Sequence, residues 1–159
     1  MSDLSSIPPD RPITPAEAAD LRHDLVTPLN LVIGYCDLLN TEPSLGESAE
    51  LLGRIRAIRQ HGFALLRSID RALLSDLAVR STADLRGLGP LLDAPAAAII
   101  AACDGCLGAP PPPELSPEAH QDLSRIRAAG QQMLERSRCL AAGSYHPDAT
   151  LRSTTDATR

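Results

Sequence analysis

A chain of 159 residues is long enough to form one domain with a hydrophobic core. Hydrophobic residues make up 43% of the chain but aromatic residues only 2%. Aliphatic side chains therefore have to fill the core, which suits packed helices better than a β-sandwich. The formal net charge of −5 argues against a nucleic-acid backbone as the main partner.

The sequence contains no apolar run of about eighteen residues, and its start lacks the basic and apolar regions of a signal peptide. We therefore expect a cytoplasmic protein that does not enter a membrane. The four cysteines, Cys36, Cys103, Cys106 and Cys139, fall in apolar helical patterns, and we expect them to be reduced and buried. Cys103 and Cys106 have metal-ligand spacing, but no second pair accompanies them, so we expect neither a bound metal nor another cofactor.

Residues 1 to 13 are rich in serine and proline and are expected to form a flexible arm. The first predicted helix covers residues 15 to 40, with Thr14 at the N-cap and Glu17 completing a capping box. Its apolar residues recur at intervals of three and four and form one stripe, which comprises Leu21, Leu25, Leu29, Val32, Ile33, Cys36 and Leu39.

Pro28 lies inside this first helix. Because proline has no backbone N–H, the carbonyl of Asp24 loses its usual helical partner. We expect a kink just beyond His23 and a free carbonyl at the level of that histidine.

A short turn at residues 41 to 46 leads to a second predicted helix, residues 47 to 80. Its apolar seam alternates between spacings of four and three and comprises Leu51, Ile55, Ile58, Gly62, Leu65, Ile69 and Ala72. Residues 14 to 80 are thus predicted to form a helical hairpin. A hairpin cannot cover both of its apolar faces, so two further helices have to pack against it.

The second half of the chain supplies those two helices, at residues 83 to 107 and 116 to 142. The last helix repeats the seam with Leu123, Ile126, Gly130, Met133, Ser137 and Leu140. Residues 143 to 159 are polar and without pattern, and we expect them to be disordered. The predicted fold is all-α, an antiparallel four-helix bundle in which a second hairpin, residues 81 to 142, completes the bundle.

Two short blocks suggest that the hairpins are copies of each other. Residues 28 to 37 match residues 95 to 104 at an offset of 67, and residues 54 to 57 match residues 125 to 128 at an offset of 71. Because both blocks occur in the same order, we infer a duplication, with the difference in offset absorbed by the hairpin loop.

His23 is the residue that points to chemistry. It falls about 150° away from the apolar stripe at 100° per residue, so it should face solvent. Asp24 follows it directly, and Thr27 lies one helical turn further on. An exposed imidazole beside a carboxylate, without metal partners, suits nucleophilic acceptance of a phosphoryl group, since the carboxylate can hold the proton that leaves the ring. Thr27 can contact a phosphoryl oxygen or place a water.

The run His23-Asp-Leu-Val-Thr-Pro-Leu-Asn30 resembles the H-box in the dimerisation and histidine-phosphotransfer (DHp, or HisKA-like) domain of bacterial two-component sensor histidine kinases. The resemblance is close over this run and extends over about residues 14 to 78. It implies that His23 is the phosphoacceptor, that Asp24 gives acid–base assistance, and that Thr27 supports dephosphorylation of a partner response regulator.

The chain departs from that family in two respects. It shows no strands or glycine-rich loop of an ATP-binding domain, so no autokinase activity is expected and a kinase would have to act in trans. In the family two subunits supply the two hairpins, whereas this chain supplies both. A monomer with a pseudo-dimeric bundle is therefore favoured over a homodimer, an organisation similar to monomeric histidine-containing phosphotransfer proteins.

The second copy has lost the reactive residues of the first. The aligned pairs are His23 with Pro90, Asp24 with Leu91, Thr27 with Ala94 and Asn30 with Ala97. We therefore expect the second hairpin to be scaffold.

The resemblance implies a response-regulator receiver domain or a histidine kinase as the partner, and any Mg²⁺ would belong to the receiver. We expect it to dock over the first two helices, where Asn30, Leu31 and Gly34 offer a contact. The favoured hypothesis is a phosphorelay protein that passes phosphoryl groups through His23. The alternatives are a non-catalytic regulator (an antikinase or receiver-binding module), a response-regulator phosphatase that uses Thr27, and a bundle with an incidental histidine.

Overall fold

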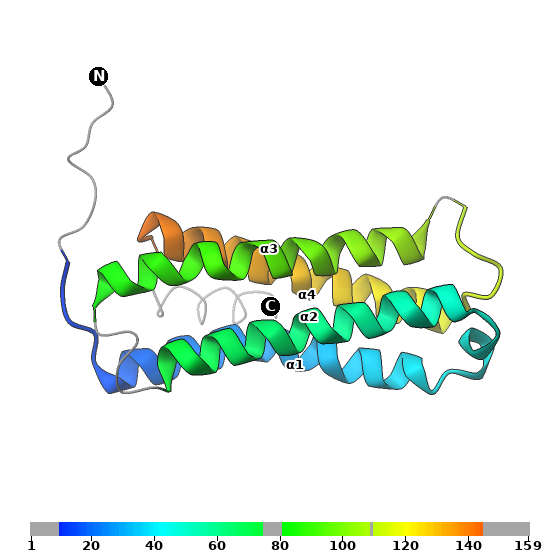
Figure 1. The fold of residues 1–159 in the computed structure, drawn as a ribbon, viewed down its shortest axis with the longest axis horizontal. Coiled ribbons are helices and arrows are strands. Elements are labelled where there is room, and N and C mark those ends of the chain that lie inside the picture. The colour runs from blue at the N-terminus through cyan, green and yellow to red at the C-terminus, as the bar shows by residue number, and fades with distance from the viewer. Residues whose placement is uncertain (1–9, 75–80, 109, 145–159) are drawn as a thin grey trace, which may run out of the picture.

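The computed structural model describes residues 10–74, 81–108 and 110–144. These residues form four long α-helices and one short 3₁₀ helix (Figure 1). The helices are α1 (Pro15–Asn40), η2 (Pro43–Glu47), α2 (Ala49–Leu73), α3 (Thr82–Leu107) and α4 (Pro117–Ala142). The predicted all-α four-helix bundle is confirmed. The first helix has its predicted bounds, whereas α2 ends at Leu73 and the expected extension over residues 75–80 lies outside the described residues.

The helices pack as two antiparallel hairpins, α1 with α2 and α3 with α4, and both hairpin loops lie at the same end of the bundle (Figure 1). The hairpins meet along two further boundaries, α2 against α3 and α1 against α4. Each helix therefore has two neighbours. For α1, which carries His23, those neighbours are α2 of its own hairpin and α4 of the other hairpin.

One aliphatic core runs through both hairpins. In α1 the stripe residues lie in this core, apart from Ile33, which is half-buried. The fully buried large side chains come from all four helices and include Leu25, Ile55, Ile58, Leu65, Leu92, Ile99 and Leu123. Burial of each such side chain contributes about 1.5–3 kcal/mol. Because the core is shared, the two hairpins form one folding unit.

Each long helix begins at a serine or threonine that caps its N-terminus. Thr14 accepts a hydrogen bond from the Glu17 N–H and forms the predicted capping box, and Ser81 forms the same motif with Asp84 at the start of α3. Ser48 and Ser116 cap the other two helices. These caps fix where the helices start, and their positions repeat between the hairpins.

The repeat between the hairpins is closer than the sequence blocks suggested. The buried residues of α2 at 51, 55, 58, 62, 65 and 69 each have a buried counterpart in α4 that lies 68 positions later. A Cβ added at Gly62 would touch Ile33, and one added at Gly130 would touch Ile100, which itself lies 67 positions after Ile33. The offset of 71 inferred for these helices is therefore wrong. An apolar seam repeats every three or four residues, so a shift by three still places apolar residues on apolar residues.

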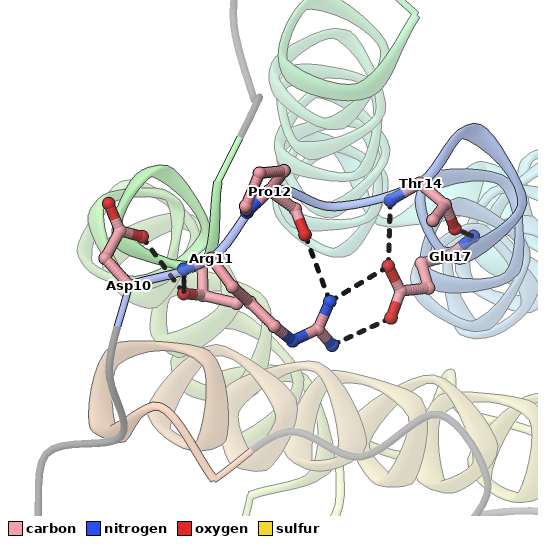
Figure 2. Close-up of polar contacts among 6 residues, drawn as sticks. Asp10, Arg11, Pro12, Thr14 and Glu17 are labelled. Atoms are coloured by element: carbon pink, nitrogen blue, oxygen red, sulfur yellow. Dashed lines mark hydrogen bonds and ion pairs between the residues drawn. The ribbon is translucent and has the colours of Figure 1, made fainter.

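The expected loose arm does not extend over residues 10–13. The Asp10 carboxylate accepts hydrogen bonds from Thr82 Oγ1 at 3.0 Å and from the Ala83 N–H at 2.8 Å, and Pro12 forms an isolated antiparallel bridge with Ser81. Figure 2 shows the Arg11 guanidinium directed at the carboxylate of Glu17, with contacts of 2.8 and 3.2 Å. This segment thus ties the start of α3 to the start of α1. The rest of the arm and most of the tail, residues 1–9 and 145–159, lie outside the described residues.

The expectation that no segment is apolar enough to cross a membrane needs one correction. Within the described part of the chain, α3 meets that criterion by length and composition, with a mean hydropathy of 1.4 over 18 residues. Buried core helices of soluble proteins pass the same test. In α3 the side chains of Leu88, Leu92 and Ile99 enter the bundle core, whereas the exposed Leu91 and alanines on the outer face raise the mean hydropathy.

Candidate functional site

His23 lies on the outer face of α1, where it is exposed to solvent as the periodicity predicts. Thr27, Asn30, Leu31 and Gly34 are exposed on the same side of the helix. The structure thus places His23, Thr27 and the expected docking residues on one side of α1. A partner can reach the imidazole without any movement of the bundle.

Thr27 is engaged with the helix that carries it. Its Oγ1 donates a hydrogen bond of 2.8 Å to the carbonyl of His23, four residues earlier. This back-bonding is common for threonine in helices and takes up the hydroxyl proton. The lone pairs of Oγ1 are directed away from the helix backbone and can accept a hydrogen bond from a water beside His23. To donate to a phosphoryl oxygen, the hydroxyl would first have to leave the His23 carbonyl.

The carbonyl of Asp24 is not free, in contrast to the sequence-based expectation. Pro28 is buried within the continuous helix α1 and supplies no N–H to that carbonyl. Instead Nη1 of Arg136, on α4, donates a hydrogen bond to it. Buried or half-buried backbone carbonyls need a donor, and here the donor comes from the second hairpin. The Asp24 residue itself is half-buried.

A second arginine of α4 also reaches α1. The guanidinium of Arg125 lies over the ring of Tyr35, 5.5 Å from the ring centre, and forms an ion pair of 3.0 Å with Asp122. Together with Arg136, it places α4 side chains along the edge of the candidate site. The second hairpin is thus in contact with α1 beside the candidate site, and the expectation that it serves only as scaffold stays a prediction. Sequence reasoning missed these arginines because only the packing of α4 against α1 reveals them.

On its other side, α1 is held to α2 by two ion pairs. Arg22 contacts Asp70 at 2.7 Å, and Arg59 contacts Asp37 at 2.6 Å. Partly exposed ion pairs of this kind contribute at most about 1 kcal/mol each. The buried stripe of α1 sets the rotation that turns His23 outward, and the two ion pairs join α1 to α2 in that orientation.

A shallow groove of about 290 Å³ continues the exposed face of α1 below His23. Its lining residues are Asn30, Leu31, Gly34, Tyr35 and Leu38. Leu31 is 48% exposed and Leu38 is 60% exposed, which is high for leucine in a helix. An added Cβ at Gly34 would meet nothing within 4 Å, so the floor of the groove is open. The three predicted docking residues, Asn30, Leu31 and Gly34, thus all line the groove, and Tyr35 and Leu38 extend it.

The cysteines show no sign of a metal or redox site. Cys36, Cys103 and Cys106 have no exposed surface, as predicted, and burial raises the pKa of Cys36 and of Cys103 to about 12. Their thiols therefore stay protonated and unreactive at neutral pH. Cys139 is exposed, so the prediction that all four are buried is wrong for that residue. Among the described residues, no three histidine, cysteine or acidic side chains gather in a way that suits a metal ion.

The equivalent place in the second hairpin is built differently. Leu91, which stands where Asp24 stands in α1, is 66% exposed. Ser68 of α2 stands where Arg136 stands in α4, and its hydroxyl donates to Ala64 of its own helix at 3.0 Å. A cavity of about 390 Å³ lies beside Ser68 and Leu91. The boundary between α2 and α3 therefore lacks both the reactive side chains and the arginine.

Comparison of the chain with protein-family models, with curated proteins and with solved structures gives no match. The residues from His23 to Asn30 and the geometry around them are therefore the features that point to a function.

Proposed function

We propose that this protein is a histidine-containing phosphotransfer protein of a bacterial two-component system or phosphorelay. It accepts a phosphoryl group on His23 and passes it to, or receives it from, the aspartate of a response-regulator receiver domain, or receives it from a kinase acting in trans. The observation that carries the proposal is the exposure of His23, with Asp24 and Thr27, on a fixed helix above an open apolar groove.

The chemistry follows from the side chains present. A ring nitrogen of neutral His23 attacks the phosphorus of an aspartyl phosphate, so that an N–P bond forms while the bond between phosphorus and the aspartyl oxygen breaks. The leaving carboxylate stays on the receiver. The proton on the other ring nitrogen is held by the neighbouring Asp24 carboxylate or by water. The reverse reaction returns the phosphoryl group to a receiver aspartate, and any Mg²⁺ is bound by the receiver.

The groove supports a protein partner more than a small molecule. It is shallow and open, and it presents two exposed leucine side chains beside a glycine. Such a surface suits a helix of a receiver domain whose apolar side chains cover Leu31 and Leu38. The Tyr35 ring and the Arg125 guanidinium over it add a rim on the α4 side.

The phosphatase alternative can be separated from transfer at Thr27. A threonine that orients water needs only a hydrogen-bond acceptor, and the lone pairs of Oγ1 supply one. Thr27→Ala should therefore leave phosphorylation of His23 intact. If Thr27→Ala removes dephosphorylation of a receiver while His23→Ala does not, the phosphatase hypothesis replaces the proposed one.

The experiment is phosphoryl transfer from radiolabelled receiver domains and kinases to the purified protein. The wild type should acquire an acid-labile, alkali-stable label, as phosphohistidine does, and His23→Ala should acquire none. His120→Ala is the matched control, since His120 is also an exposed histidine on a bundle helix. Equal labelling of His23→Ala and wild type, or no labelling by any cognate donor, would overturn the proposal.

A further inference from the structure

Pro28 separates the candidate phosphoacceptor from the docking groove along α1. His23 and Asp24 precede it, whereas the groove begins at Asn30 and ends at Leu38. A partner seated on the groove has to bring its phosphoryl group to His23 across this proline. The path of α1 through Pro28 therefore sets how far the imidazole lies from the docked partner.

The helix is least resistant to bending at this point. Residue 28 has no N–H, so the Asp24 carbonyl lacks the bond that an ordinary residue at that position would donate, and helices bend most readily where such a bond is missing. A displacement of about 1 Å between reacting groups can lower a rate by about a hundredfold. Phosphoryl transfer at His23 thus needs a restraint that α1 does not supply.

Arg136 supplies a restraint from the other hairpin. Its Nη1 donates to the Asp24 carbonyl, the group to which Pro28 cannot donate, from a position 112 residues further along the chain. Hydrogen bonds from a charged guanidinium are stronger than those between neutral groups. Arg136 is half-buried, and α4 packs against both α1 and α3, so the donor is itself firmly held.

The second hairpin shows that the proline alone does not require this arginine. Pro95 occupies the same place in α3 and removes the same kind of bond from the carbonyl of Leu91. The residue at the position equivalent to Arg136 is Ser68, whose hydroxyl bonds within its own helix. The bundle thus tolerates such a proline without an arginine. Only the copy that carries the histidine has both.

We propose that Arg136 is a positioning residue of the phosphotransfer site. By holding the Asp24 carbonyl, it restrains α1 where Pro28 removes a backbone bond and so places the imidazole of His23 against the aspartate of a receiver docked on the groove. The second hairpin is thereby part of the site. This inference rests on the proposed function and assigns a role to one residue outside the H-box.

The first test measures the steady-state transfer from a phosphorylated receiver to the full-length protein. Arg136→Met should lower kcat about ten- to a hundredfold and leave KM for the receiver unchanged, because the groove is untouched. Arg136→Lys should recover part of the loss, since its ammonium can donate to the same carbonyl. Arg138→Met is the matched control: Arg138 lies on the same helix, is largely exposed, and faces Asp93 at 3.9 Å.

The second test removes the need for the arginine. Pro28→Ala restores an N–H that can bond to the Asp24 carbonyl, so Arg136→Met should have little effect on kcat in that background. The same loss in both backgrounds, or no loss in the presence of Pro28, would overturn the inference. These outcomes differ from a failure of the proposed function, in which the wild type itself acquires no label on His23.

Discussion

The two boundaries between the hairpins occupy equivalent places in the bundle, yet they differ in every residue that bears on function. Where α4 meets α1, Arg136 bonds to the Asp24 carbonyl and Arg125 covers the Tyr35 ring. Where α2 meets α3, a serine stands in place of Arg136, an exposed leucine stands in place of Asp24, and a cavity of about 390 Å³ lies between them.

The comparison separates the packing constraints that the two copies share from the surface positions at which they differ. The buried positions of α2 recur in α4 at one fixed offset, because both hairpins have to fill the same aliphatic core. The residues at the surface between the hairpins carry no such packing constraint. The first boundary carries Asp24 and Arg136 beside His23, and the second keeps the proline and the core but has a leucine and a serine at these two positions.

The variant with the largest expected effect tests whether the partner binds to the exposed face of α1 and not to the equivalent face of α3. Gly34→Arg places a long charged side chain on the open floor of the groove. It should lower kcat/KM for a phosphorylated receiver by about a hundredfold or more, as the loss of a central contact in an interface does. Steady-state transfer kinetics measure the effect.

The matched control lies on α3. Ala101 is exposed and stands 67 positions after Gly34, so Ala101→Arg adds the same side chain to the equivalent face of the second hairpin. It should leave transfer unchanged. Comparable losses in the two variants would mean that both faces bind partners and that the functional contrast between the hairpins is wrong.

A smaller effect, on the free energy of unfolding, is expected where a glycine of α3 lies close to α4. A Cβ added at Gly89 of α3 would lie 2.4 Å from the carbonyl oxygen of Ser137 and 2.7 Å from the Ala141 nitrogen, both on α4. The helices would have to move apart, so Gly89→Ala should lower the free energy of unfolding by about 1–3 kcal/mol.

Gly34→Ala is the counterpart on the open face of α1. Nothing there meets an added Cβ, and alanine favours the helix over glycine by about 0.5–1 kcal/mol. Urea unfolding of both variants should therefore give changes of opposite sign. A Gly89→Ala protein as stable as the wild type would show that α3 and α4 do not need their close approach.

The smallest expected effect is on the pH dependence of stability, and it involves Glu17 at the start of α1. Hydrogen bonds from Arg11 and from the Thr14 N–H lower the pKa of the half-buried Glu17 carboxyl from 4.5 to about 2. A carboxyl with a lowered pKa stabilises the fold above its ordinary pKa, and this contribution is lost as the pH falls toward about 2.

Glu17→Gln should therefore reduce thermal stability slightly at neutral pH, and the difference from the wild type should vanish between pH 4.5 and about 2. Glu118→Gln, in the first turn of α4, controls for the loss of a negative charge at a helix start. A difference between Glu17→Gln and wild type that stays constant over this pH range would show that the contact with Arg11 adds no stability.

Much of the fold could be predicted because it follows from local patterns. The spacing of Leu21, Leu25 and Leu29 gave the buried face of α1, and the cap at Thr14 gave its first residue. The register between α2 and α4 could not be obtained in this way. A seam of similar residues every three or four positions matches itself at several offsets, and only the burial of each side chain distinguishes them.

The sequence by itself determined the outward direction of His23 and the loss of the N–H that would bond the Asp24 carbonyl, because helical periodicity and the chemistry of proline are local properties. The tertiary structure alone decided what replaces that bond. Arg136 lies 112 residues from Asp24, and its reach depends on α4 packing beside α1. Non-local contacts of this kind follow from the arrangement of helices, and a pattern within one helix carries no information about its neighbour.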